Sequence, residues 1–166
     1  MGILSSKKEL TIYMAGLPDA EVHQTRLQFN PETGKHIALT KIFFYKENYK
    51  NLIIDFIEKG FETYHKESIK NLDALIYVVD SSNEYDNITE SANLLREVFK
   101  TQNLGENSPV LIIGSCRNKD KSLSEVEIIE KMKLYEIIGR DWKLVLHSVY
   151  DKDYNDDLDW IINHIV

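Results

Sequence analysis

The sequence predicts a single α/β domain built on a mostly parallel β-sheet with helices on both faces. Short apolar, β-branched runs alternate with segments of helical period along all 166 residues, without a linker, repeat or low-complexity segment between them. Residues 74–80 (ALIYVVD) form a continuous apolar run, which is typical of a strand buried on both faces. The chain also has about the usual length of one domain.

The first half of the chain predicts three strands and two helices. An Asn-Pro-Glu-Thr-Gly turn separates the first helix from the second strand. The second and third strands are joined by a short polar turn, most simply as an antiparallel hairpin. The strands are predicted at residues 10–15, 36–45 and 52–57, and the helices at residues 21–29 and 61–72.

The helix after residues 74–80 has candidate caps and one apolar face. Asp80, Ser81 and Ser82 offer side chains that cap a helix N-terminus. Four apolar residues then recur at spacings of four, three and four, which places them on one face of the helix. These residues are Ile88, Ala92, Leu95 and Phe99.

The rest of the chain predicts strands at residues 110–113 and 143–149, with a helix after each. Ser122 or Ser124 can cap the first of these helices. Ligands of such sheets bind outside the carboxyl ends of the strands, so the loops after Ala15, Asp55, Asp80, Gly114 and Ser148 are the candidate site. The helix after residues 110–113 holds Val126, Ile129 and Met132, and the final helix of the chain holds Leu158, Ile161, Ile162 and Ile165.

Composition and charge exclude several classes of protein. Hydrophobic residues make up 43% of the chain, too many for an intrinsically disordered segment. The net charge of −7 argues against nucleic-acid binding, because nucleic-acid-binding proteins usually present a basic face. No apolar run approaches the roughly 20 residues of a membrane-spanning helix. The single cysteine, Cys116, fits a reducing compartment, so we expect a cytoplasmic protein without a signal peptide.

Residues 1–9 are expected to form an N-terminal extension to a domain over residues 10–166. The opening sequence MGILSS fits the pattern for N-myristoylation, with Gly2 as the acceptor. One myristoyl chain binds a membrane only marginally, and Lys7-Lys8 is a thin second signal. Gly2 therefore predicts at most a weak, peripheral attachment to membranes.

The element order and several local sequences resemble the Arf and Arf-like branch of the small GTPases. Residues 16–20 (GLPDA) resemble the opening of that branch's phosphate loop, and residues 75–81 (LIYVVDS) resemble its fourth strand. Residues 27–30 are similar to the end of the helix that follows that loop, and residues 159–161 are similar to the family's last helix. The resemblance implies a P-loop NTPase-type fold with a mostly parallel six-stranded sheet, one antiparallel hairpin strand and helices on both faces.

The phosphate loop of that family is altered in this chain. A phosphate loop reads Gly-x-x-x-x-Gly-Lys-Ser/Thr, because backbone amides cradle the phosphates, the lysine reaches the outer ones and the hydroxyl holds magnesium. Counted from Gly16, the last three positions are Glu21, Val22 and His23. An acid therefore stands beside the expected phosphate charge, and a neutral side chain replaces the lysine.

The two other nucleotide motifs also differ from the family pattern. Asp55 matches the aspartate of the Asp-x-x-Gly motif, but Glu58 and Lys59 take the glycine and glutamine positions. The guanine-reading Asn-Lys-x-Asp motif falls on residues 115–118, so Asn118 stands in place of its aspartate.

The resemblance combined with these losses implies an Arf-like pseudo-GTPase. It would act as a protein-binding module or scaffold, in membrane trafficking or in an assembly that recruits Arf-like folds, without GTP hydrolysis, metal or cofactor. The alternative is a divergent switch that binds GTP or GDP with Mg²⁺ through replacements such as Arg26, Arg117 or Lys119. The nucleotide would then contact Gly16, Asp19, Ala20, Glu21, Val22, His23, Asp55, Asn118 and Ser148.

An unrelated doubly wound enzyme or a receiver-type domain is a third, weaker hypothesis. A receiver needs an acidic pair at the end of the first strand, and a dinucleotide enzyme needs Gly-x-Gly-x-x-Gly there. Ala15-Gly16 offers neither. The five histidines show no zinc-ligand spacing.

Aromatic residues near the hairpin are candidates for binding a partner. In the family this region lies between the switches and helps bind effectors, and a fixed aromatic surface could anchor a protein partner. Core packing explains the same residues equally well. The residues are Phe43, Phe44, Tyr45, Tyr49 and Tyr64.

Three further side chains have ordinary structural interpretations. Asp80 is expected to cap a helix, and Asp55 to satisfy nearby backbone amides. Cys116 is expected to be an inert, partly buried thiol, because the sequence shows no partner for nucleophilic chemistry.

Overall fold

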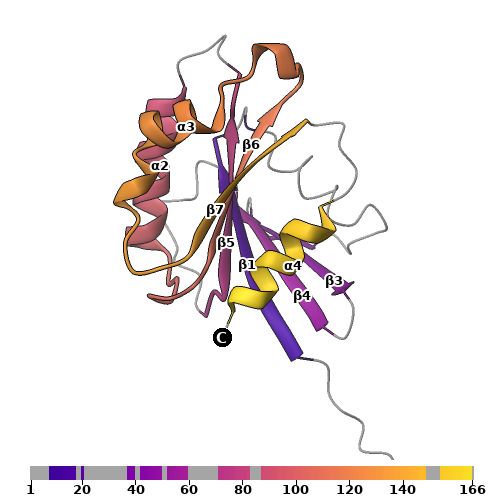
Figure 1. Cartoon of the computed structure of the whole chain (residues 1–166). Helices are drawn as coiled ribbons and strands as arrows, with labels where there is room; N and C mark the ends of the chain where they lie inside the picture. Colours follow the sequence, from indigo (N-terminus) through magenta and orange to yellow (C-terminus); the bar gives the residue numbers. More distant parts are fainter. Residues whose placement is uncertain are drawn as a thin grey trace, which may run out of the picture.

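The computed structural model describes residues 8–17, 20, 37–39, 42–49, 52–59, 71–82, 87–148 and 154–165, with only the backbone for 37–39, 42–49 and 52–59. The strands are β1 (Lys8–Gly16), β2 (Ile37–Leu39), β3 (Ile42–Tyr49), β4 (Leu52–Lys59), β5 (Ala74–Asp80), β6 (Val110–Cys116) and β7 (Trp142–Ser148). They form one seven-stranded sheet in the order β2-β3-β4-β1-β5-β6-β7 (Figure 1).

The sheet is mostly parallel, with an antiparallel edge. β4, β1, β5, β6 and β7 pair in parallel, whereas β3 pairs antiparallel with both β2 and β4. The predicted hairpin between β3 and β4 is therefore confirmed. The single strand predicted over residues 36–45 is wrong, because Leu39 pairs with Ile42 and the chain reverses direction between them. No glycine or proline marks this reversal in the sequence, so the described sheet has one strand more than the six predicted.

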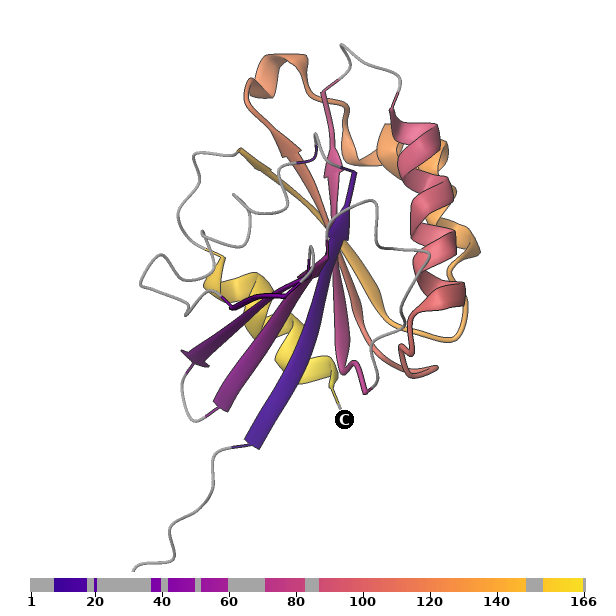
Figure 2. The same cartoon turned by 180° about the vertical axis from the view of Figure 1, so that it is seen from behind.

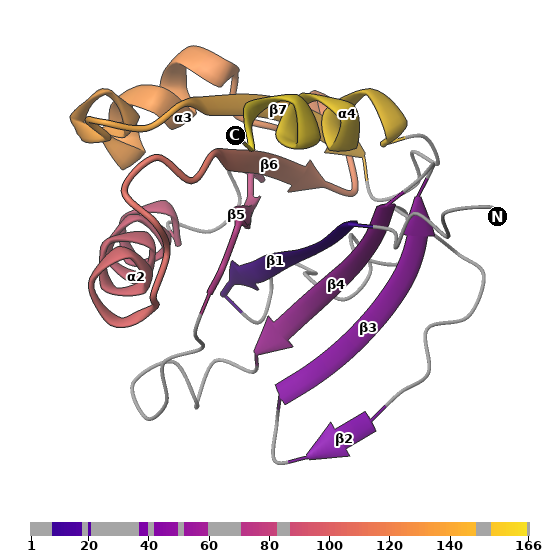
Figure 3. The ribbon, with the colours of Figure 1, turned by 90° about the horizontal axis from the view of Figure 1, so that it is seen from below.

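Helices cover both faces of the sheet, as predicted. They are α2 (Ile88–Thr101), α3 (Glu125–Met132) and α4 (Asn155–His164), with short 3₁₀ turns η3 (Lys119–Lys121) and η4 (Leu134–Glu136). α2 and α3 lie on one face and α4 on the other (Figures 2 and 3). The helix predicted at residues 21–29 and most of the one at 61–72 lie outside the described residues. Asn71 has a positive φ of 60° and Leu72 forms a β-bridge with Leu104, so the second prediction is wrong at its last two residues.

Two apolar cores form because alternate residues of the central strands point to opposite faces. Tyr13 and Tyr77 belong to the core beneath α2 and α3, whereas Ile12 and Ile76 belong to the core beneath α4. All six residues 74–79 are fully buried, which confirms the interpretation of their continuous apolar run. The predicted face of α2 is also confirmed, because Ile88, Ala92 and Leu95 are buried and Phe99 packs against them.

The helix caps agree with the sequence at α3 and disagree at α2. Ser124 forms a capping box with Glu127, in which the Ser124 hydroxyl accepts from the Glu127 amide at 3.3 Å and the Glu127 carboxylate accepts from the Ser124 amide at 2.8 Å. α2 begins after Asn87 without a side-chain cap. The cap predicted at Asp80 is wrong, because Asp80 Oδ1 accepts from the Ser82 amide at 2.9 Å.

Candidate functional site

The carboxyl ends of the parallel strands gather at one edge of the sheet. β1, β5, β6 and β7 end at Gly16, Asp80, Cys116 and Ser148, and β4 ends at Lys59. Because these strands are parallel neighbours, the loops that follow them meet at this edge, where ligands of open α/β sheets bind. The loop positions predicted after residues 15, 80 and 148 agree with these ends within one residue.

The start of the phosphate-loop segment is anchored on both faces of the sheet. Leu17 follows β1 and is buried in the core beneath α2 and α3. Ala20 is buried at 1% exposure in the core beneath α4, and its amide donates to the Leu17 carbonyl at 3.0 Å. Leu17 and Ala20 therefore lie in the cores on opposite faces of the sheet. Asp19, Glu21, Val22, His23 and Gly2 lie outside the described residues.

Asp55 does not lie at the site edge. It was predicted to close its strand, but β4 continues to Lys59, and Asp55 pairs in register with Thr11. Thr11 lies five residues before Gly16 on β1, which is about 16 Å along a strand at roughly 3.3 Å per residue. The prediction that Asp55 closes its strand is therefore wrong.

The loops after β5 and β6 are tied together by Ser81. The Ser81 amide and hydroxyl both donate to the Ser115 carbonyl, at 2.9 and 3.0 Å. The Ser81 carbonyl accepts from the Leu123 amide at 2.7 Å, and the Ser81 and Ser122 hydroxyl oxygens lie 3.0 Å apart. Ser81 is fully buried, so these bonds hold the two loops at a fixed separation.

Two of the four positions aligned with the base-reading motif lie in the sheet, and the other two, Arg117 and Asn118, are exposed. Ser115 and Cys116 are still part of β6 and are each 5% exposed. Asn118 is exposed, but its side-chain oxygen accepts from the Asp120 amide at 3.0 Å, within the turn that carries η3. Residues 118–120 (Asn-Lys-Asp) look similar to the base-reading motif but are displaced by three residues and lack its spacer. In the structure they carry a local turn of the kind that asparagine commonly forms. Ser148 is 8% exposed and pairs in register with Cys116.

A cavity of about 360 Å³ opens beside these positions. Two of its polar side chains are used within the protein, because Ser124 and Glu127 form the capping box. The Cys116 thiol lies 4.0 Å from the His147 carbonyl and is buried, in line with the unreactive thiol expected from the sequence. The described part of the chain holds no group of three His, Cys, Asp or Glu side chains that could bind a metal. The cavity is lined by Cys116, Ser122, Leu123, Ser124, Glu127, Leu146 and His147.

A buried polar cluster between β7 and α4 was not predicted. Asp157 is 5% exposed, accepts from the Lys143 ammonium group at 3.1 Å, and lies 2.6 Å from Nε2 of His147. Burial acts to raise the pKa of Asp157, but the hydrogen bonds from His147 and Lys143 outweigh it and lower the pKa below its ordinary value. The even spacing of Lys143 and His147 on one strand was the available signal, because it places both on one face. The cluster attaches α4 to the sheet.

Comparison with known proteins identifies the relatives of this chain. A sequence model of the ADP-ribosylation factor family matches residues 2–165. The ADP-ribosylation factor-like protein 3 of Caenorhabditis elegans is 25% identical over 167 aligned positions, covering 96% of this chain and 90% of the relative. None of the described helices is both long enough and apolar enough to cross a membrane.

Proposed function

The chain belongs to the ADP-ribosylation factor family, and from this premise we propose that it is an Arf-like pseudo-GTPase that binds a protein partner without a nucleotide cycle. The proposal rests on one observation. The positions that would carry charge to a bound nucleotide hold other residues: Val22 for the phosphate lysine, His23 for the magnesium hydroxyl and Asn118 for the base-reading aspartate.

The size of the expected loss follows from the interactions removed. A hydrogen bond to a charged group contributes about 1.5–3 kcal/mol, so three such losses remove roughly 5–9 kcal/mol of binding free energy. Each 1.4 kcal/mol is tenfold in affinity, and guanine-nucleotide affinity should therefore fall by at least about three orders of magnitude. The register of Asp55 supports the proposal, because Asp55 pairs with Thr11, which lies roughly 16 Å along β1 before Gly16.

The partner surface that we propose is the antiparallel edge of the sheet. Phe43, Phe44, Tyr45 and Tyr49 all belong to β3, which lies next to the edge strand β2. Aromatic residues contribute strongly to protein interfaces when a partner covers them. Tyr64, the fifth aromatic candidate, lies outside the described residues. We also propose a role in membrane trafficking or in an assembly that recruits Arf-like folds, with weak membrane attachment through Gly2.

Isothermal titration of nucleotide-stripped protein with GTP and GDP, with and without Mg²⁺, tests the proposal. We expect no binding up to high micromolar nucleotide, and no nucleotide in mass spectra of the purified protein. The matched variant Glu21→Gly/Val22→Lys/His23→Thr returns the phosphate-loop residue types, and we expect it to bind GTP at least about tenfold more tightly than the natural chain. Micromolar, magnesium-dependent binding by the natural chain would contradict the proposal.

The divergent-switch alternative predicts a different result in the same titration. If Arg117 and Lys119 replace the lost motif residues, the natural chain binds nucleotide, and the variant Arg117→Gln/Lys119→Gln binds it more weakly. A measurable affinity that this variant leaves unchanged would argue against compensation by these residues.

A further inference from the structure

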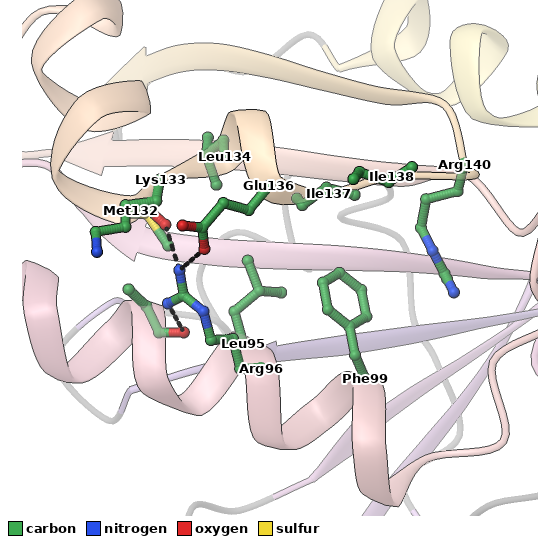
Figure 4. A pocket seen from close by; sticks show the side chains of 11 residues that line it. Leu95, Arg96, Phe99, Met132, Lys133, Leu134, Glu136, Ile137, Ile138 and Arg140 are labelled. Atoms are coloured by element: carbon green, nitrogen blue, oxygen red, sulfur yellow. Dashed lines mark hydrogen bonds and ion pairs between the residues drawn. The ribbon is translucent and has the colours of Figure 1, made fainter.

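We draw no further inference here: the strongest candidate, the groove between α2 and the segment that follows α3 (Figure 4), is a surface at which Arg96 already bonds to Glu136 and Arg140 already lies over the Phe99 ring, and nothing in the structure shows what covers it.

Discussion

The replacement of Asp157 by asparagine should destabilise the protein by an amount that depends on pH. The Asp157 carboxylate is 7% exposed and joins α4 to β7 through Lys143 and His147, at 3.1 and 2.6 Å. Asparagine keeps the shape and one acceptor oxygen but removes the charge and the second acceptor. The neutral side chain therefore offers one acceptor to the two partners, Lys143 and His147, and no charge to either.

The expected magnitude follows from those two bonds. A buried hydrogen bond to a charged group contributes about 1.5–3 kcal/mol. The bond with Lys143 contributes less, because the Lys143 side chain is 36% exposed and solvent screens the pair. We therefore expect Asp157→Asn to lower the free energy of unfolding by about 2–3 kcal/mol at pH 7. In a domain of this size, that corresponds to a fall in Tm of about 4–12 °C.

The pH dependence has a definite sign. Burial opposes ionisation of Asp157, but its hydrogen bonds with His147 and Lys143 dominate, so its folded-state pKa lies below the ordinary value. Its stabilising contribution is therefore complete above the unfolded-state pKa of about 3.9 and is lost as the pH falls through the lower folded-state pKa. The stability difference between the natural chain and Asp157→Asn should shrink in that acidic window.

Urea denaturation followed by tryptophan fluorescence measures the effect at pH 7 and at a series of lower values. Asp156→Asn is the matched control, because Asp156 precedes Asp157 in the first turn of α4 and is exposed. Both substitutions remove a negative charge from the first turn of α4 and change its interaction with the helix dipole similarly. The difference between their effects on the free energy of unfolding therefore measures the contribution of the buried cluster. Equal effects of the two variants, or a loss at Asp157 that does not change with pH, would refute this reasoning.

Two further substitutions test the fold around the candidate site. A Cβ at Gly114 would lie 2.5 Å from Leu146 Cδ2, so Gly114→Ala should lower the free energy of unfolding by about 1–3 kcal/mol in urea denaturation, and by less in a Leu146→Val background. An equal cost in both backgrounds would contradict the predicted clash. Ser124→Ala should cost about 0.5–2 kcal/mol because it removes the cap of α3, whereas Ser124→Thr keeps the hydroxyl acceptor. Equal free energies of unfolding for Ser124→Ala and Ser124→Thr would show that the cap contributes nothing.

Much of the fold could be predicted because it depends on local patterns. The run at residues 74–80 indicated a buried central strand, and the spacing from Ile88 to Phe99 indicated the buried face of α2. Ser124 was one of two predicted caps of α3. Residues near one another in the chain decide these features, since strand alternation, helix period and capping act over a few positions.

The candidate site was less predictable, because it depends on which distant residues become neighbours. Asp55 matched a family motif by its neighbours in the sequence, but pairing with Thr11 places it inside β4. The acid and base of the Asp157–His147 cluster lie ten residues apart on different elements.

The sequence alone determined the family, the alternating architecture and the apolar face of α2. Only the tertiary structure decided the register of Asp55, the reversal between Leu39 and Ile42, the joining of two loops by Ser81 and the position of Arg140 over the Phe99 ring. The physical reason is that strand register and side-chain pairing are set by packing between segments far apart in the chain. A local pattern specifies which side of an element is buried, but it does not specify the partner that buries it.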